Sequence, residues 1–126
     1  MICAKDIMKR KIVTIRENTK ASRVGEILSQ KKLNTICIVD REKRLKGIVT
    51  EKDILNAMAK GGFTRKRASD IMTTHVVSLK RDTDINDITK IFSRKSFMCL
   101  PVVSKKRVVG MVHRSQVLYR LMDNYY

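Results

Sequence analysis

The sequence contains no tryptophan, few other aromatic residues and no long apolar run. Its aromatic residues are three phenylalanines and three tyrosines among 126 residues. Recognition of nucleic acid by base stacking needs aromatic side chains interleaved with basic ones, and that pattern is missing here. No apolar run approaches the ~18–20 residues that cross a bilayer, and the N-terminus lacks the apolar stretch of a signal peptide. We therefore expect a cytoplasmic protein that has no membrane partner.

Cysteine and histidine are also scarce. Cys3, Cys37 and Cys99 are widely spaced without a CxxC pair, which argues against a disulfide framework and against a zinc site. The two histidines, His75 and His113, lie 38 positions apart (113 − 75) and are poor material for acid–base catalysis. The sequence has no Walker loop, no GxSxG and no HExxH motif. We therefore expect no enzyme, no catalytic residues, no metal site and no required cofactor.

Positive charge is what the sequence has in excess. It carries 28 Lys and Arg against 12 Asp and Glu, a net charge of +16. The charge is dispersed, because residues 1–63 hold 15 basic and 7 acidic residues (+8) and residues 64–126 hold 13 and 5 (+8). Its clusters are short, such as Arg65-Lys66-Arg67. The excess favours an anionic partner: nucleic acid, an acidic protein or a phosphorylated small molecule. The alternative is a solvated basic surface.

The equal charge of the halves reflects an internal repeat. Residues 4–8 return as residues 68–72, and residues 36–39 return as residues 100–103, at an offset of 64. After a one-residue deletion, Gly47-Ile48-Val49 returns as Gly110-Met111-Val112. The repeat predicts two domains of similar fold over residues 1–62 and 63–126. A half of about 63 residues is marginal alone, so we expect the two halves to share an interface.

Each half is predicted to run β-α-β-β-α after a short turn that holds an Asp-Ile-Met motif. In the first half the predicted strands cover residues 12–15, 35–39 and 47–49, and the predicted helices cover residues 20–31 and 50–60. Val24, Ile27 and Leu28 give the first helix one buried face, and Gly61-Gly62 ends the second. The fold class is α+β of α/β type, with two pseudosymmetric repeats packed through their sheets.

Helix starts are predicted from short polar side chains. Asn18 or Thr19 is expected to cap the first helix, and Asp82 or Thr83 its counterpart in the second half. Thr50 and Asp53 have the spacing of a capping box, with the acid three residues after the cap. The two carboxylate oxygens of Asp53 also suit the vicinal diol of a ribose. The two interpretations are compatible and both stay open.

The motifs together, in order and twice, resemble the tandem CBS domain pair, or Bateman module. The resemblance rests on the Asp-Ile-Met motifs at 6–8 and 70–72, on Leu-Pro-Val-Val at 100–103, and on the run from Gly47 to Leu55. It covers nearly the whole chain, so we expect a stand-alone pair without an attached catalytic or transport domain. The resemblance implies a regulatory module that binds an adenosine-containing ligand (AMP, ADP, ATP or S-adenosylmethionine) in the cleft between the repeats.

The resemblance also implies which residues contact the ligand. Thr50 and Asp53 would hold the nucleoside. The other expected ligand-binding residues are Val13, Thr14 and Val77 bordering the cleft, Ile36, Cys37, Ile38 and Pro101 around the adenine, and Lys9, Lys11, Lys32, His113 and Arg114 near the phosphates. Ordinary core strands and solvated cations are the alternatives for these residues. Pro101 is expected at a strand start, where its missing N–H is tolerated.

The second half departs from the pattern, because His113 and Gln116 stand where the first half has Thr50 and Asp53. We therefore predict one well-formed site, centred on the first half. Relatives also imply a homodimer formed through apolar helix faces, which the sequence places at Ile54, Leu55 and Met58 and at Val117, Leu118 and Leu121. The alternative function is a basic adaptor that binds nucleic acid or an acidic protein without a small molecule.

Overall fold

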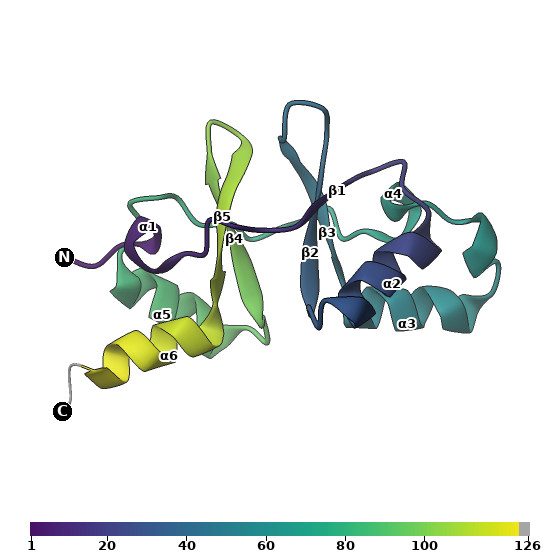
Figure 1. Cartoon of the computed structure of the whole chain (residues 1–126). Helices are drawn as coiled ribbons and strands as arrows, with labels where there is room; N and C mark the ends of the chain where they lie inside the picture. Colours follow the sequence, from purple (N-terminus) through teal and green to yellow (C-terminus); the bar gives the residue numbers. More distant parts are fainter. Residues whose placement is uncertain (124–126) are drawn as a thin grey trace. The chain divides into compact units, whose positions relative to one another are not determined.

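The computed structural model describes residues 1–123, and the chain divides into two compact units (Figure 1). The central unit is one continuous stretch, Val13–Val76. The terminal unit combines Met1–Ile12 with the chain from Val77 onward. Each unit has its own buried core and its own sheet.

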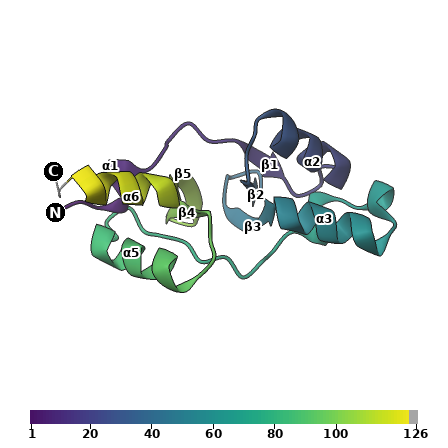
Figure 2. The same cartoon turned by 90° about the horizontal axis from the view of Figure 1, so that it is seen from below.

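The central unit consists of a three-stranded sheet and its helices. Its elements are β1 (Thr14–Arg16), α2 (Ala21–Gln30), β2 (Thr35–Val39), β3 (Leu45–Thr50), α3 (Glu51–Lys60), the 3-10 turn η1 (Phe63–Arg65) and α4 (Ala68–Ile71). The strand order is β1-β2-β3, with β1 parallel and β3 antiparallel to β2. α2 and α3 lie side by side and cover one face of this sheet (Figures 1 and 2).

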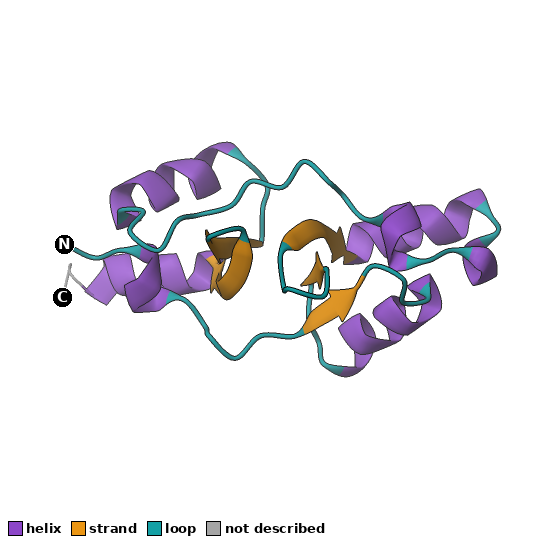
Figure 3. Ribbon diagram, turned by 90° about the horizontal axis from the view of Figure 1, so that it is seen from above, coloured by secondary structure: helices purple, strands orange, loops and turns teal. Residues whose placement is uncertain are grey.

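The terminal unit is a two-stranded hairpin with two longer helices. Its elements are α1 (Ala4–Ile7), α5 (Ile85–Arg94), β4 (Cys99–Ser104), β5 (Arg107–His113) and α6 (Arg114–Asp123). β4 and β5 are antiparallel, and α5 and α6 lie on one side of them (Figure 3). The α1 helix docks here because Ala4 N donates to Thr83 O and Lys5 N to Arg81 O, each at 2.9 Å. The first twelve residues thereby complete a unit built mainly from the second half of the chain.

The compact units cross the predicted repeat boundary between residues 62 and 63. In the central unit, α4 comes from the second repeat and docks on the loop before α2. Ala68 N donates to Thr19 O at 2.7 Å, and Ser69 N donates to Glu17 O at 3.0 Å. These are amides of a first helical turn, which have no partner inside their own helix. Each unit therefore takes its short Asp-Ile-Met helix from the other repeat.

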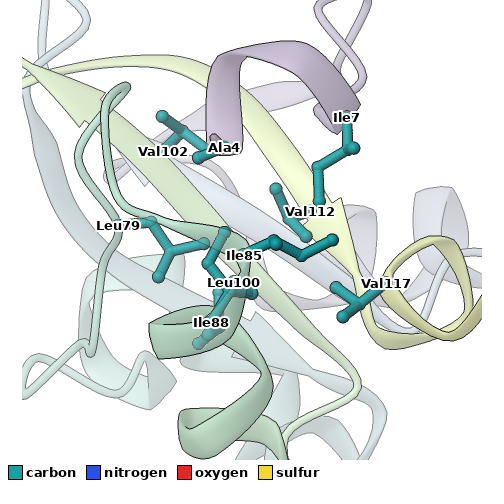
Figure 4. Packing of buried hydrophobic residues seen from close by; sticks show 9 residues of the cluster. All are labelled: Ala4, Ile7, Leu79, Ile85, Ile88, Leu100, Val102, Val112 and Val117. Atoms are coloured by element: carbon teal, nitrogen blue, oxygen red, sulfur yellow. The ribbon is translucent and has the colours of Figure 1, made fainter. Parts of the chain in front are cut away.

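Apolar side chains from strands and helices fill each core. The core of the terminal unit contains Ala4, Ile7, Leu79, Ile85, Ile88, Leu100, Val102, Val112 and Val117 (Figure 4). The core of the central unit contains Ile15, Val24, Leu28, Ile36, Ile38, Val49 and Ala68. Val117 is 3% exposed, and Leu121 and Ile54 pack against these cores. The expectation that Val117 belongs to an exposed helix face is therefore wrong, because the residue is needed by its own unit.

The predicted helix over residues 20–31 is confirmed by α2. The caps predicted for this helix and for its counterpart α5 are wrong. Lys20 precedes α2, and Asp84 precedes α5, where its Oδ1 accepts a hydrogen bond from Asn86 N at 2.7 Å. Thr19 instead gives its carbonyl to α4, as described above. The Thr83 hydroxyl accepts from Lys80 N at 2.8 Å in the preceding turn. The candidate cap residues are therefore used by neighbouring segments.

Pro101 lies in the third position of β4 and is fully buried, so the expectation of a strand start is corrected. Its carbonyl accepts from Leu79 N at 2.9 Å, which means that the proline nitrogen also faces the segment around Leu79. A proline nitrogen donates no hydrogen bond. The equivalent residue in the central unit, Cys37, keeps its N–H, and there β1 pairs with β2 over three residues. Among the described residues of the terminal unit, the matching pairing is the single bridge Leu79–Val102.

Gly47 and Gly110 allow the segment after each Asp-Ile-Met motif to lie against a strand. Thr73 pairs with Ile48, and Lys9 pairs with Met111. A Cβ atom on Gly47 would lie 2.8 Å from Thr73 O, and one on Gly110 would lie 2.9 Å from Lys9 O. These distances leave no room for a methyl group, so glycine is required at both positions.

Candidate functional site

The predicted capping box forms at the start of α3. Thr50 N donates to Asp53 Oδ2 at 2.8 Å, and Asp53 N donates to Thr50 Oγ1 at 3.2 Å. The Thr50 hydroxyl also lies 3.1 Å from Asp53 Oδ2. The carboxylate thus satisfies one amide at a helix start, where a negative charge is favourable. The capping interpretation of Thr50 and Asp53 is confirmed. Of the two carboxylate oxygens, Oδ2 makes the contacts with Thr50.

Thr73 adds a second hydroxyl to this carboxylate, and the sequence analysis missed it. Its Oγ1 lies 3.4 Å from Asp53 Oδ1 and 3.5 Å from Asp53 Oδ2. The backbone of Thr73 is fixed by reciprocal bonds with Ile48, at 2.8 and 3.0 Å. Among the contacts within residues 1–123, the long Thr73 contact is the one that reaches Oδ1, so this oxygen can accept a further hydrogen bond. The repeat offset of 64 could have indicated Thr73, because Thr73 is the counterpart of Lys9, which was already a candidate.

The equivalent position in the terminal unit has a different charge. His113 N donates to Gln116 Oε1 at 2.8 Å, which repeats the cap of Thr50 N by Asp53. The His113 ring Nδ1 lies 2.8 Å from Ser115 Oγ. Gln116 therefore keeps the helix-capping bond without the negative charge. This agrees with the prediction that the second half departs from the pattern of the first.

Cations surround the terminal position. Burial, and next the charges of Lys9 and Arg114, lower the pKa of His113 below its usual value. Burial also raises the pKa of Cys99 to about 11, although Lys9 partly opposes this shift. The Cys99 thiol is consequently neutral at ordinary pH and poorly suited to be a nucleophile. The central unit offers a carboxylate at its helix start, whereas the terminal unit offers an imidazole among cations.

The strand residues predicted to surround the adenine are buried. Ile36 and Cys37 are 1% exposed, Ile38 is fully covered, and Pro101 is fully buried as well. Ile36 and Ile38 belong to the central core. Their side chains therefore serve packing, which was the alternative interpretation. Contact of these residues with a ligand stays a prediction.

The remaining strand candidates are more accessible. Val13 and Thr14 are half-buried in the central unit, where Thr14 begins β1. Val77 is exposed and belongs to the terminal unit. These residues are open to solvent in part, and ligand binding by them stays a prediction.

The candidate phosphate contacts are distributed unevenly. Lys9 and Lys11 belong to the terminal unit with His113 and Arg114, although their sequence repeat is the first. Lys32 lies at the end of α2 and lines a hollow of about 500 Å³ between α2 and α3. The residues lining that hollow include neither Thr50 nor Asp53. The structure therefore groups four of these candidates in one unit and places Lys32 in the other.

Two further findings concern only residues 1–123. No cluster of three or more His, Cys, Asp or Glu residues in this range is arranged to hold a metal ion. None of its helices is both long enough and apolar enough to span a membrane.

Comparison with known proteins gives one family relationship. The CBS domain model matches residues 4–60 and 68–123 of this chain. A homoserine O-acetyltransferase of Methanohalobium evestigatum is 30% identical over 121 residues, which are 95% of this chain. The chain spans only 24% of that enzyme's length. The relationship therefore concerns the matching segment of the acetyltransferase, and the enzyme's activity does not follow from it.

Two solved structures share the fold at comparable identity. The CBS domain pair of protein MJ0100, in complex with 5-methylthioadenosine and S-adenosyl-L-methionine, has a TM-score of 0.84 at 29% identity and covers 100% of this chain and 99% of that one. The cytosolic domain of the Mg²⁺ channel MgtE, in complex with ATP, has a TM-score of 0.81 at 29% identity, over 94% of this chain and 48% of that one. With both repeats matched and the fold shared, the chain belongs to the CBS domain family.

Proposed function

We propose that this protein is a regulatory module that binds an adenosine-containing ligand through Asp53 of the central unit. One observation carries the proposal. Asp53 caps α3 mainly through Oδ2, while Oδ1 has only a long contact with the Thr73 hydroxyl among the described residues. A carboxylate oxygen with spare acceptor capacity beside two hydroxyl groups suits a ribose diol. The half-buried position of Asp53 strengthens such a bond relative to one in bulk water.

The family relationship supports the same ligand class. The MJ0100 pair is described with 5-methylthioadenosine and S-adenosylmethionine, and the MgtE domain with ATP. These ligands share an adenosine group and differ in what is attached to its 5′ position. The net charge of +16 favours a ligand that carries phosphate groups. AMP, ADP and ATP are therefore preferred candidates over uncharged adenosine.

A regulatory role is the proposal for a protein that binds a ligand and does not transform it. We propose that the protein catalyses no reaction and that ligand binding shifts the balance between conformations of the chain. A ligand can shift such a balance only by the difference between its affinities for the two states. The role therefore requires that the ligand stabilise one conformation more than the other.

The test is a titration of AMP, ADP, ATP and S-adenosylmethionine with the wild type and with Asp53→Asn. Asparagine keeps an oxygen that can accept from Thr50 N, so the cap survives while the charge is lost. A hydrogen bond to a charged group contributes about 1.5–3 kcal/mol, so we expect affinity to fall by roughly 10–100-fold. The measurements are calorimetry and a thermal shift, since a ligand at 100 times its Kd stabilises a fold by ~2.7 kcal/mol.

Asp6→Asn is the matched control. Asp6 Oδ2 accepts from Cys3 N at 2.8 Å at the start of α1, the same bond that Asp53 makes with Thr50 N. The control variant removes one capping charge from the terminal unit and should bind like the wild type. Unchanged affinity of Asp53→Asn for every adenosine ligand would show that the ribose assignment is wrong.

The net charge of +16 favours one alternative, a basic adaptor that binds nucleic acid or an acidic protein. Binding through phosphate contacts would be strongly salt-dependent. If the adenosine compounds leave the melting temperature unchanged while duplex DNA binds with a steep salt dependence, the adaptor function is correct and the proposed one is not.

We also propose that two copies of the chain associate. α3 exposes Leu55 and Met58, and α6 exposes Leu118, Tyr119 and Met122. Apolar side chains grouped on a helix surface favour burial against a partner. A second copy of the chain is the partner that we propose for these surfaces.

A further inference from the structure

The turn between α3 and η1 borders an open basic hollow in the central unit. The hollow has a volume of about 440 Å³ and is lined by Lys60, Gly61, Gly62, Arg65, Lys66 and Asp70. None of these residues belongs to the site proposed for the adenosine ligand. We call this feature the Gly61–Gly62 hollow.

The charges that line the hollow are unbalanced. Lys60, Arg65 and Lys66 supply three positive charges and Asp70 supplies one negative charge. Asp70 Oδ2 already accepts from Arg67 N at 2.8 Å. Within residues 1–123, none of the three cations takes part in a salt bridge. Lys60 also lies in the last turn of α3, where a cation is favourable, but that helix end does not account for Arg65 and Lys66.

The backbone around the hollow is held in place by defined bonds. Arg65 N donates to Gly62 O at 3.1 Å, and Lys66 N donates to Phe63 O at 3.0 Å. The carbonyl of Lys66 accepts from Ala21 N at 2.9 Å, which ties the turn to the start of α2. These bonds fix the positions from which the cationic side chains extend, so less freedom is lost when an anion binds.

The Arg65 side chain folds back over the turn. Gly62 has a φ of +72°, and a Cβ atom built there would lie 3.2 Å from Arg65 Nη2. Gly61 has a φ of +85°, but a Cβ atom there would meet nothing within 4 Å. Glycine at position 62 therefore has two effects: it allows the left-handed turn, and it leaves room for the guanidinium group above it.

We propose that the Gly61–Gly62 hollow binds a small oligophosphate anion. A guanidinium group presents paired donors that match two phosphate oxygens, and the two ammonium groups add charge for neighbouring phosphates. The volume lies within the usual range for small-ligand sites, roughly 300–1,000 Å³. Because the hollow is lined by one short turn and by Asp70 of α4, it fits a compact chain of phosphate groups better than an extended polymer. This site is additional to the adenosine site at Asp53.

The probe is inorganic tripolyphosphate, titrated into the full-length protein by calorimetry at low ionic strength. The test variant combines Lys60→Gln, Arg65→Gln and Lys66→Gln. The matched control combines Lys105→Gln, Lys106→Gln and Arg107→Gln, which also removes two lysines and one arginine, here from the exposed β4–β5 turn and the first residue of β5. We expect affinity to fall by about 10-fold or more in the test variant and by about 2-fold or less in the control.

A second pair of variants tests the geometry without a change of charge. Gly62→Ala brings a methyl group against Arg65, whereas Gly61→Ala strains the backbone without touching that side chain. Melting temperatures show whether each variant is folded. We expect Gly62→Ala to weaken tripolyphosphate binding and Gly61→Ala to leave it unchanged.

Three results would overturn the proposal. The first is an equal loss of affinity in both triple variants, which would mean general attraction to a basic protein. The second is an absence of tripolyphosphate binding by the wild type. The third is a test variant whose affinity for tripolyphosphate is unchanged but whose affinity for a single-stranded oligonucleotide is lost. That result would show that the three cations bind nucleic acid. Affinity for AMP should be the same in both triple variants, so this outcome is separable from failure of the Asp53 site.

Discussion

The acceptor side chain that caps the helix differs between the two units, Asp53 in the central unit and Gln116 in the terminal unit. Asp53 accepts from Thr50 N at 2.8 Å, and Gln116 accepts from His113 N at the same distance. The bond that starts the helix is therefore conserved in geometry, while the charge is present in the central unit only. Replacement of a carboxylate by an amide leaves the fold intact and changes which ligand groups can be bound.

The spacing of Thr50 and Asp53 was sufficient to predict their contact, because a capping box is local. Thr73 lies 20 residues beyond Asp53, and its contact depends on the backbone pairing of Thr73 with Ile48. Local patterns do not encode such a pairing. The same holds for Lys9, a residue of the first repeat whose backbone pairs with Met111 of the second.

At the scale of one residue, we predict that protonation of His113 destabilises the fold. Its pKa is lowered in the folded protein by burial and by Lys9 and Arg114, so the unfolded chain binds the proton more readily. The stabilising contribution is complete above the ordinary histidine pKa of about 6.5 and is lost as the pH falls through the lower folded pKa. Urea unfolding at several pH values measures this loss, which His113→Gln should reduce.

His75→Gln removes the other imidazole, which is exposed, and is the control for this experiment. The loss of stability between neutral and acidic pH should persist in this variant. If His113→Gln and the wild type lose the same unfolding free energy over that range, His113 is not responsible.

At the scale of elements, close contact between a strand and the segment beside it sets a steric requirement. We predict that Gly110→Ala destabilises the protein by about 1–3 kcal/mol, because the new methyl group would overlap Met8 Sδ and Lys9 O. Gly25→Ala should be neutral or stabilising by up to ~1 kcal/mol, since its methyl group makes ordinary contact with Ile54 and alanine favours a helix. Urea midpoints that move in the same direction for both variants would contradict this prediction.

The elements themselves were largely predictable from periodicity and glycine positions. α2, β2 and the hairpin partner β3 appear within a few residues of their expected ranges. The reduced first strand of the terminal unit was not foreseen, because it depends on which side of β4 the nitrogen of Pro101 faces. The sequence shows that Pro101 lacks an N–H donor. Only the strand pairing shows that the missing hydrogen bond is one between β4 and the segment around Leu79.

At the scale of the whole molecule, we predict that Leu55→Asp shifts the protein from dimer to monomer. Leu55 is 65% exposed on α3, and burial of such a side chain in an interface contributes roughly 1.5–3 kcal/mol. Native mass spectrometry over a range of concentrations should show a dissociation constant raised by about 10-fold or more.

Asn56→Asp is the control for this measurement, because it adds the same charge to the neighbouring exposed position of α3 without removing apolar surface. It should leave the dimer intact. A wild-type protein that is monomeric at all concentrations would refute the proposed association.

The exchange of short helices between repeats has a consequence for synthesis of the chain. Residues 13–76 leave the ribosome as one continuous stretch, and the central unit can form as soon as they have emerged. The α1 helix is made before the central unit, but its backbone partners Arg81 and Thr83 are made after it. The apolar residues Ala4 and Ile7 therefore stay exposed until the other core residues of the terminal unit, from Leu79 to Val117, have been made.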